Sequence, residues 1–499
     1  MPIKLSRANL PQLSARAAVP AYDPERLAAG IVHFGVGNFH RAHQAVYLDD
    51  LFNLGQDHDW ALVGAGVRAA DEDMRRKLLA QDLLTTVVAQ EADRAAARIT
   101  SSMVAFLEPG DPAAIIGKLA DPAIRIVSLT ITEGGYYIDP ATQAFNRAHP
   151  DIAADGKDLA APKTVFGLIV AGLQRRRAQG IRPFTVMSCD NIPGNGHVAR
   201  NAVVGLAALA DPGLARWIET DVAFPNGMVD RITPATSERE RARLAEEFGI
   251  ADNWPVFCEE FRQWVVEDHF PAGRPGLEKA GVRMVSDVAP FEVMKIRILN
   301  GGHATIAYPA ALMDIHFAHE AMENELIRGF LHKVEREEII PIVPPVPDTD
   351  LQDYFRLIDR RFANPRIGDT IARLCLDGSN RQPKFIVPSV RDRLAAGGGV
   401  TGLALVSALW CRYCHGETDS GKPIAPNDEN WPRLTERARM AKADPKAWLA
   451  MRDIYGELAA NEIFAAEFRG ALNAIWAQGT STTLRRYVAT AGATAASLT

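Results

Sequence analysis

Long apolar runs are absent from this 499-residue chain. A membrane-spanning helix needs roughly 18 or more consecutive apolar residues, and no such stretch occurs. The first residues, MPIKLSRANLPQLSARAAVPAYD, also lack the continuous apolar segment of a signal peptide. We therefore expect neither a membrane partner nor export, and we expect a cytoplasmic protein.

Cysteine is scarce. The chain has five cysteines, an odd number scattered along its length: Cys189, Cys258, Cys375, Cys411 and Cys414. This pattern argues against a disulfide framework and for reduced thiols. The segment CRYCHG (residues 411–416) matches the C-x-x-C-H pattern of covalent haem attachment, but that chemistry requires an exported protein. We expect core thiols there and not a haem electron carrier.

Neither sign of charge dominates, since 61 acidic and 55 basic residues leave a net charge of -6. The chain therefore has no general attraction to nucleic acid, and none is expected as a partner. The short basic run QRRRAQ (residues 174–179) is interpreted as the solvated end of a helix. With 47% hydrophobic and 23% charged residues, the chain has the composition of a globular protein. Its length calls for at least two domains.

Short apolar, β-branched segments alternate with helical patterns in the first half of the chain. The expected strands are residues 30–37, 60–67, 84–90, 123–132 and 183–191, and amphipathic helices are expected over 41–55 and 164–180. Such alternation predicts an α/β fold with a parallel sheet covered on both faces. We assign residues 1–285 to a Rossmann-type dinucleotide-binding domain.

Long helical patterns dominate from about residue 286 onward. They cover residues 291–320, 322–339, 399–416 and 459–479, with a proline-rich connector, IPIVPPVPDTD, after the second of them. Residues 286–499 are therefore predicted to form a second, mostly α-helical domain. The candidate catalytic residues discussed below make it the expected substrate and catalytic domain.

A glycine turn follows the first predicted strand. In IVHFGVGNFHRAHQ, Gly35 suits a tight turn, and Gly37 lets the backbone approach a pyrophosphate. The helix that opens at Asn38 and Phe39 offers its free N–H groups to the anion. His40 occupies the place of the third glycine in the usual fingerprint. The context still predicts a dinucleotide site, although a simple strand-to-helix turn is the competing interpretation.

The end of the second strand leaves the choice of dinucleotide open. NAD-binding folds usually place a carboxylate there to bind the ribose hydroxyls. In VGAGVRAADEDM, Arg68 comes first, and an arginine is able to meet the 2′-phosphate of NADP. NAD is the expected cofactor, with NADP as the alternative.

The segment FEVMKIRILNGGHATIAYPAAL carries polar residues within an apolar helix. Glu292, Lys295, Asn300 and His303 fall within about 140° of one side of an α-helix, but Lys295 and His303 are ~12 Å apart along a straight axis. The pair Gly301–Gly302 is costly in a helix. We expect either that the four residues line an extended substrate, or that the glycines loosen the turn and bring them together. The glycines would also let sugar or nicotinamide approach the backbone.

These residue types suit the oxidation of a secondary alcohol. A lysine, usually too basic, becomes a general base when burial favours its neutral form. The alkoxide then needs fixed donors, for which Asn300 and Asn191 (in SCDNIPGNG, at a strand end) are candidates. Glu292 is placed to pass the proton to water. The competing interpretation is a surface ion pair between Glu292 and Lys295, with His303 as an ordinary core histidine.

Five motifs in the same order, GVGNFHRAH, TITEGGYY, SCDNIPGNG, FPNGMVDRITP and KIRILNGGH, resemble those of the mannitol dehydrogenase family, the polyol-specific long-chain dehydrogenases and reductases. The resemblance covers nearly the whole chain. It implies Lys295 as the base, Asn191 and Asn300 as the alkoxide-stabilising pair, and Glu292 as the proton outlet. It also implies that His303 binds substrate.

The resemblance extends to further residues. It implies that Asp230 and Arg373 bind the distal hydroxyls. Separately from the resemblance, Lys384 is a further candidate for substrate binding, and Thr130 and Glu133 of TITEGGYY are candidates for cofactor binding. The resemblance implies a reaction without a metal that uses NAD, and a Rossmann-type domain joined to a helical one. The protein is expected to be a monomer or a homodimer.

The expected activity is hydride transfer between NAD(H) and an acyclic polyol/ketose pair. D-mannitol/D-fructose is the best guess, and D-arabinitol, D-sorbitol and D-altritol are further candidates. A hexuronate reductase, acting on fructuronate or tagaturonate, is the alternative, because Arg373, Arg381 and Lys384 are available to meet a carboxylate. A dinucleotide-binding sensor without catalysis is the non-enzymatic alternative.

Overall fold

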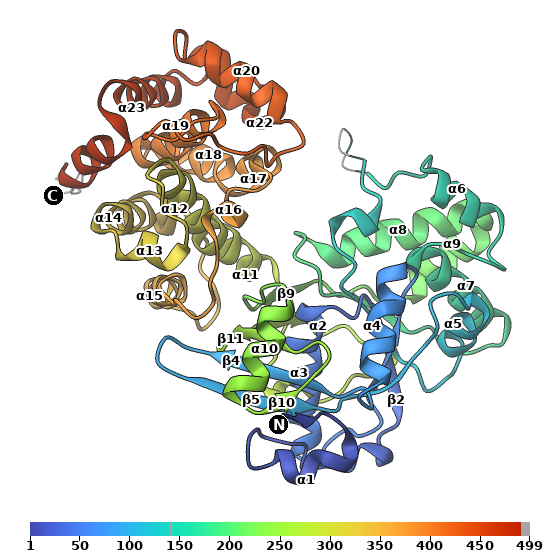
Figure 1. Cartoon of the computed structure of the whole chain (residues 1–499). Coiled ribbons are helices and arrows are strands. Elements are labelled where there is room, and N and C mark those ends of the chain that lie inside the picture. The colour runs from blue at the N-terminus through green and yellow to red at the C-terminus, as the bar shows by residue number, and fades with distance from the viewer. Residues whose placement is uncertain (140–141, 143, 491–499) are drawn as a thin grey trace. The chain divides into compact units, whose positions relative to one another are not determined.

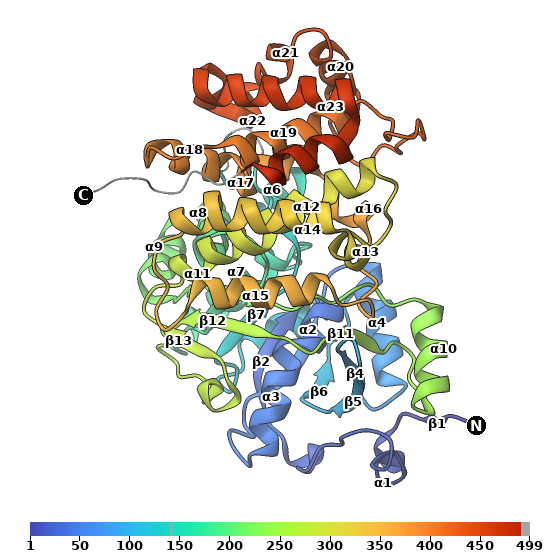
Figure 2. The ribbon, with the colours of Figure 1, turned by 90° about the vertical axis from the view of Figure 1, so that its left-hand side faces the viewer.

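The computed structural model describes residues 1–139, 142 and 144–490. It forms two compact units, Met1–Ala289 and Pro290–Thr499, called below the N-terminal unit and the helical unit (Figures 1 and 2). No helix within the described residues combines the length and apolar composition needed to cross a membrane.

The centre of the N-terminal unit is a five-stranded sheet in which every neighbouring pair is parallel. The strand order is β6 (Met103–Phe106), β3 (Ala61–Ala65), β2 (Ala29–Phe34), β7 (Ile126–Leu129) and β8 (Thr185–Ser188). Three of these strands lie within segments that the apolar runs predicted, and a fourth, β2, overlaps its predicted segment but begins one residue earlier. Their side chains are almost all buried, as expected for a parallel sheet covered on both faces.

Helices cover both faces of this sheet. One face packs against α5 (Pro112–Leu119), α7 (Val165–Ala178) and α8 (Asn195–Ala210). The other packs against α3 (Gln44–Asn53). The remaining helices of the unit are α1 (Leu10–Leu13), α2 (Asn38–Ala42), α4 (Ala69–Leu79), α6 (Pro150–Lys157), α9 (Pro212–Asp221) and α10 (Glu238–Glu247). The predicted α/β fold of Rossmann type is confirmed.

The strand predicted over residues 84–90 forms as β4 (Thr85–Gln90), but it does not join the parallel sheet. It pairs antiparallel with β5 (Ala95–Thr100) and parallel with β11 (Val256–Glu259). The tight turn between β4 and β5 is the cause, because such a short connection only produces antiparallel neighbours. The strand itself was predicted correctly, but its expected place in the parallel sheet was wrong. The edge position of that sheet is taken by β6.

Two small sheets complete the N-terminal unit. The order β13–β12–β9 joins Arg283–Val285, Gln263–Glu267 and Gly227–Asp230, and β1 (Ile3–Lys4) pairs with β10 (Ile250–Ala251). None of these strands was predicted. Most are short, and burial of their residues depends on neighbours distant in sequence.

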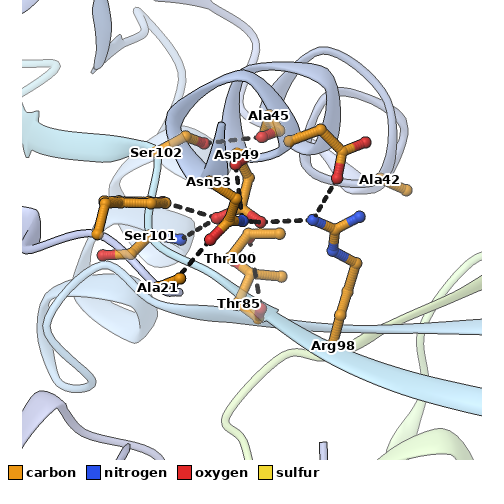
Figure 3. A network of polar contacts seen from close by, with 12 residues as sticks. Ala21, Ala42, Ala45, Asp49, Asn53, Thr85, Arg98, Thr100, Ser101 and Ser102 are labelled. Atoms are coloured by element: carbon orange, nitrogen blue, oxygen red, sulfur yellow. Dashed lines mark hydrogen bonds and ion pairs between the residues drawn. The ribbon is translucent and has the colours of Figure 1, made fainter. Parts of the chain in front are cut away.

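A buried charge network joins the β4–β5 hairpin to α3 (Figure 3). Arg98 Nη2 lies 2.5 Å from Asp49 Oδ2 and 2.7 Å from Asp50 Oδ1. Asp49 also accepts hydrogen bonds from the Tyr22 hydroxyl and the Ser101 N–H. Burial raises the pKa of Asp49, an effect that Arg98 opposes. Removing Arg98 would leave a buried carboxylate without its cation, so the pair ties strand to helix.

The basic run at residues 174–179 is only partly a solvated helix end. Arg175 and Arg177 are exposed, but Arg176 is 2% exposed. Its guanidinium donates to four backbone carbonyls, those of Leu119, Asp121, Ile124 and Arg182. The prediction was wrong for Arg176, because a planar group with five donors is able to satisfy several loop carbonyls at once.

The helical unit is built around α12 (Gly301–Leu312), which is almost entirely buried. It packs against α14 (Glu325–Val334), visible beside it in Figure 2, and against α16 (Ile371–Leu374) and α19 (Thr401–Cys414). The other helices are α11 (Ala289–Met294), α13 (Ala318–Glu323), α15 (Leu351–Phe362), α17 (Gly378–Phe385), α18 (Val387–Ala395), α20 (Trp431–Ala441), α21 (Lys446–Leu449), α22 (Arg452–Tyr455) and α23 (Glu462–Ala489). The predicted second, mostly helical part of the chain is confirmed.

The C-x-x-C-H motif lies in the core of the helical unit. Cys411 and Cys414, on α19, are at most 1% exposed, and burial raises the pKa of both thiols. His415 packs edge-on against Trp476. The three residues belong to the packing of α19 and α23, as the core-thiol interpretation predicted.

Candidate active site

The glycine turn lies where β2 ends and α2 begins. Gly35 has φ +92°, and a Cβ there would lie 2.1 Å from the Thr130 carbonyl oxygen, so glycine is required. At Gly37, the N-cap of α2, the nearest atom to a Cβ would be the Gly35 carbonyl oxygen at 3.8 Å. The turn therefore has bare backbone facing open space before a helix start, which fits a pyrophosphate.

The side chains of Asn38 and Phe39 contact the protein itself. Asn38 donates to the Pro234 carbonyl and the Thr236 hydroxyl and accepts from Arg41. The Phe39 ring stacks on His43, with ring centroids 4.8 Å apart. These two predicted cofactor residues thus have their backbone N–H groups to offer, while their side chains hold α2 in place.

Arg68 lies beyond β3, at the N-cap of α4, with 60% of its side chain exposed. The acidic residues that follow it form hydrogen bonds and ion pairs with groups of α4 and of the turn before it. The Asp71 carboxylate accepts from the backbone N–H groups of Val67 and Arg68, both at 2.9 Å, and Asp73 pairs with Lys77. The exposed charged group at this strand end is therefore an arginine.

Thr130, Glu133 and Asn191 follow the carboxyl ends of the neighbouring strands β7 and β8, so the structure brings these predicted residues to one edge of the sheet. Thr130 Oγ1 donates to the Gly35 carbonyl at 2.7 Å. Glu133 begins the 3₁₀ helix Glu133–Tyr136 and is exposed, as is Asn191. This edge is where ligands bind in parallel α/β sheets.

Asp190 organises this edge and was missed in the sequence. Its buried carboxylate accepts from the N–H groups of Ile131 and Thr132 and from the Tyr136 hydroxyl. It thereby joins the loop after β7 to the loop after β8 and supports the neighbouring Asn191. A carboxylate directly after a buried strand was the available signal. Asp230 is also buried, at the end of β9 in the same unit.

In the helical unit, the segment that carries the predicted base is a π-helix, Lys295–Asn300, between α11 and α12. Lys295 is 6% exposed and Asn300 is 9% exposed, so the surface ion-pair interpretation is wrong for the lysine. Glu292 is half-buried in the preceding turn. A π turn pairs residues five apart and brings them closer to one side than an α-helix does. Lys295 and Asn300 have this spacing.

The glycine pair does not loosen the helix. Gly301 has helical dihedrals, φ -62° and ψ -41°, and the widened turn lies before it. A Cβ at Gly302 would be 3.3 Å from Glu335 Oε1 and from Phe362 Cε2. Protein atoms, and neither sugar nor nicotinamide, therefore occupy the space beside Gly302. Glu335 is fully buried, and burial raises its pKa well above the usual range.

His303 lies in the first turn of α12 and stacks on Phe362, with ring centroids 4.1 Å apart. Its buried Nε2 has no hydrogen-bond partner within the described part of the chain. Burial lowers the pKa of His303 well below its usual value, and the cations of Arg373, Arg361 and Arg381 lower it further. The imidazole is thus neutral, and its Nε2 is a buried polar atom without a described hydrogen-bond partner.

The predicted distal residues differ in setting. Arg373 forms an ion pair with Asp369, and half of its side chain is exposed. Lys384, on α17, is exposed. Arg361 is buried and close enough to influence His303, but nothing in its local sequence, DRRF, distinguished it. The structure therefore brings Arg373, which was predicted as a site residue, close enough to influence His303, and it adds Arg361, which was not predicted.

Buried neutral histidines predict acid sensitivity. Burial lowers the pKa of His33 and His43 to about 3, against about 6.5 in an unfolded chain. Between these values the unfolded state binds more protons, so stability falls as pH falls, by up to about 1.4 kcal/mol per pH unit for each histidine. Urea unfolding at a series of pH values from 7 to 4 measures the slope.

The replacement His43→Gln should flatten that slope, and His269→Gln, at an exposed histidine, serves as the control. An equal slope in His43→Gln and the unchanged protein would contradict the assignment of His43 as a buried neutral group.

A Rossmann-type unit with a glycine turn, followed by a helical unit with a buried lysine, defines a class of two-domain, dinucleotide-dependent dehydrogenases. Family comparison is more specific. Residues 29–279 match the mannitol dehydrogenase Rossmann domain, and residues 287–476 match the mannitol dehydrogenase C-terminal domain. The chain belongs to the mannitol dehydrogenase family, which confirms the resemblance seen in the motifs.

Relatives are similar over nearly their full length. The mannitol 2-dehydrogenase of Cereibacter sphaeroides is 63% identical over 471 residues, covering 94% of this chain and 98% of the relative. That of Aspergillus fumigatus is 42% identical over 499 residues, covering 98% and 99%.

Solved structures agree with this fold. Pseudomonas fluorescens mannitol 2-dehydrogenase, in a ternary complex with NAD and D-mannitol, has a TM-score of 0.88 and 41% identity, covering 97% of this chain and 99% of that one. A substrate-free D-sorbitol dehydrogenase has a TM-score of 0.89 and 36% identity, covering 96% and 100%.

Proposed function

We propose that this protein is an NAD-dependent polyol 2-dehydrogenase that interconverts an acyclic polyol and its ketose, with D-mannitol and D-fructose as the preferred pair. The observation that carries the proposal is the buried π turn with Lys295 and Asn300 five residues apart, in a chain of the mannitol dehydrogenase family. The mannitol 2-dehydrogenase bound to NAD and D-mannitol, at 41% identity, supports both the cofactor and the substrate.

The N-terminal domain, residues 1–285, is proposed to hold the dinucleotide. The backbone of Gly35, Gly37, Asn38 and Phe39 would bind the pyrophosphate at the helix start, and the bare turn described above supports this role. Arg68, Thr130 and Glu133 are proposed as further contacts to the ribose and nicotinamide portions. When bound, the nicotinamide supplies hydride chemistry.

The helical domain, residues 286–499, is proposed to carry the general base. Lys295, as a neutral amine, would accept the hydroxyl proton at Nζ, because burial disfavours the charged form of an amine. Asn300 and Asn191 would donate amide hydrogens to the alkoxide oxygen. Glu292, half-buried and one turn from Lys295, would return the proton to water.

Substrate orientation is proposed for the remaining site residues. His303, whose buried Nε2 has no hydrogen-bond partner among the described residues, is suited to bind a hydroxyl near the reacting carbon. Asp230, Arg373 and Lys384 would bind the distal hydroxyls. Burial, reinforced by the nearby arginine cations, lowers the pKa of His303, so the ring is neutral and able to accept a hydrogen bond from a polyol.

A substrate panel tests the proposal. D-mannitol, D-sorbitol, D-arabinitol and D-altritol are compared with fructuronate and tagaturonate, in the oxidative and reductive directions and with each of NAD(H) and NADP(H). We expect D-mannitol with NAD to give the highest kcat/KM. Turnover of uronates alone would overturn the polyol assignment, and a preference for NADP would assign Arg68 to a 2′-phosphate. Dinucleotide binding without turnover of any substrate would favour a sensor.

We also propose that the protein acts in the cytoplasm, as a monomer or a homodimer, on small molecules. The balanced charge supports the absence of a nucleic-acid partner.

A further inference from the structure

A row of buried polar groups runs from α3 to the glycine turn. The Gln44 amide lies 3.0 Å from Ser128 Oγ, which lies 2.8 Å from His33 Nδ1. His33 Nε2 is 2.9 Å from Thr130 Oγ1, and that hydroxyl is 2.7 Å from the Gly35 carbonyl oxygen. His33, Ser128 and Gln44 are at most 2% exposed. These three side chains therefore lie beneath the turn and out of reach of a ligand, whereas Thr130 is partly exposed.

The donor and the acceptor of each hydrogen bond in the row can be assigned in turn, starting from the Gly35 carbonyl. A carbonyl only accepts, so the Thr130 hydroxyl donates to Gly35. The hydrogen between Thr130 Oγ1 and His33 must then come from His33 Nε2. Burial lowers the pKa of His33 to about 3, so the ring is neutral and its Nδ1 carries no hydrogen. Nδ1 therefore accepts from the Ser128 hydroxyl.

The last bond decides the orientation of Gln44. Gln44 Oε1 faces Ser128 Oγ in the structure. Because Ser128 gives its only hydrogen to His33, the group that faces it has to be a donor, so we infer that the Gln44 amide is turned over and that its nitrogen donates to Ser128. The two amide orientations are nearly indistinguishable by shape. With the oxygen facing Ser128, Gln44 Nε2 has no hydrogen-bond partner within the described residues. Turning the amide over replaces that orphaned donor by a carbonyl, which proteins tolerate better.

The plane of the His33 ring is fixed independently. His40 stacks on it with ring centroids 3.5 Å apart and an angle of 12° between the planes. His40 stands where the usual fingerprint has its third glycine, which allows close packing of helix on strand. Here the two flat rings provide that packing, and neither nitrogen of His40 has a hydrogen-bond partner in the described chain.

We propose that His33 is a positioning residue for the dinucleotide: through Thr130 it fixes the Gly35 carbonyl and thereby the Gly35–Gly37 turn. His33 Nε2 also lies 3.3 Å from this carbonyl oxygen, and the Gly37 N–H bonds to it at 2.7 Å, so three groups contact the carbonyl. A turn that is rigid before binding loses less entropy when the dinucleotide arrives. The inference rests on the proposed function, and it assigns a role to a residue that the dinucleotide does not touch.

The test measures NADH affinity by protein fluorescence, which needs no turnover. His33→Leu and Thr130→Val should each raise the Kd for NADH about tenfold, with the KM for polyol changed less than about twofold, as expected when one hydrogen bond that orders the turn is lost. Thr130→Ser restores the hydroxyl and should recover most of the affinity. Thr185→Val is the matched control, because it removes a buried hydroxyl from the same sheet that has no described partner.

The ¹⁵N spectrum of the histidine-labelled protein without ligand gives a second readout. We expect His33 to carry its hydrogen on Nε2. The Nδ1–H form, or an unchanged Kd in folded His33→Leu, would overturn the proposal. If NADH binds with these effects but no polyol is oxidised, the positioning role stands and the proposed function fails.

Discussion

Replacing Lys295 with alanine is expected to lower kcat by about 10³- to 10⁴-fold, the upper part of the range for a positioned general base. Lys295 lies in the π turn with 6% of its surface exposed, so water does not readily substitute for the missing amine. The Kd for NADH should change little, because the residues proposed to bind the dinucleotide remain intact. Steady-state kinetics and fluorescence titration measure the two quantities.

The pH dependence separates loss of a base from loss of structure. The unchanged enzyme should lose kcat/KM as the base becomes protonated, whereas Lys295→Ala should lack that acidic limb. Lys333→Ala is the matched control, since it removes a lysine of the same unit that donates to the Tyr487 carbonyl oxygen and has no proposed role in the site. Normal turnover by a folded Lys295→Ala protein would refute the assignment of the base.

Replacing Asn300 with alanine is expected to lower kcat by about 10²- to 10³-fold, the usual cost of removing one donor to a developing oxyanion. Asn191→Ala should have an effect of similar size, because the two amides are proposed to share one oxygen. The polyol KM should change much less than kcat, since the donors act mainly after the proton has left.

The double variant distinguishes a shared role from two separate ones. Asn191→Ala with Asn300→Ala should cost less than the product of the single losses if both amides serve one alkoxide. Asn461→Ala is the control: this asparagine caps α23, so its loss should lower Tm and leave kcat unchanged. An Asn300→Ala protein with a raised KM and normal kcat would assign Asn300 to ground-state binding.

Local sequence patterns predicted where strands and helices form better than they predicted which strands pair and which side chains are buried. The strand over residues 84–90 forms where its β-branched residues indicate, yet it pairs in another sheet because a tight turn returns the chain to it. Arg176 stands between two exposed arginines and turns inward because backbone carbonyls of residues 119–124 and of Arg182 require donors. In both cases a contact decides the outcome, and the strand or helix pattern of the segment does not show that contact.

The candidate site shows the same division. Lys295 and Asn300 were recognisable as polar residues within an apolar helix, and their burial agrees with that prediction. The π turn was not predicted, because the cost of glycine in a helix indicated a loosened turn at Gly301–Gly302, whereas the widened turn lies just before these glycines. Asp190 and His33 were missed since their importance lies in contacts across neighbouring strands.

Periodicity, turn chemistry and an ordered set of motifs are local properties of the chain, so the fold class, the glycine turn and the family could be predicted from the amino-acid sequence alone. The burial of individual groups and the way they share hydrogens became visible in the folded chain: a neutral His33 that holds a carbonyl of the glycine turn, and a widened helical turn at the proposed base. Burial and hydrogen bonding arise from residues far apart in the chain that pack together, so they emerge only once the chain has folded.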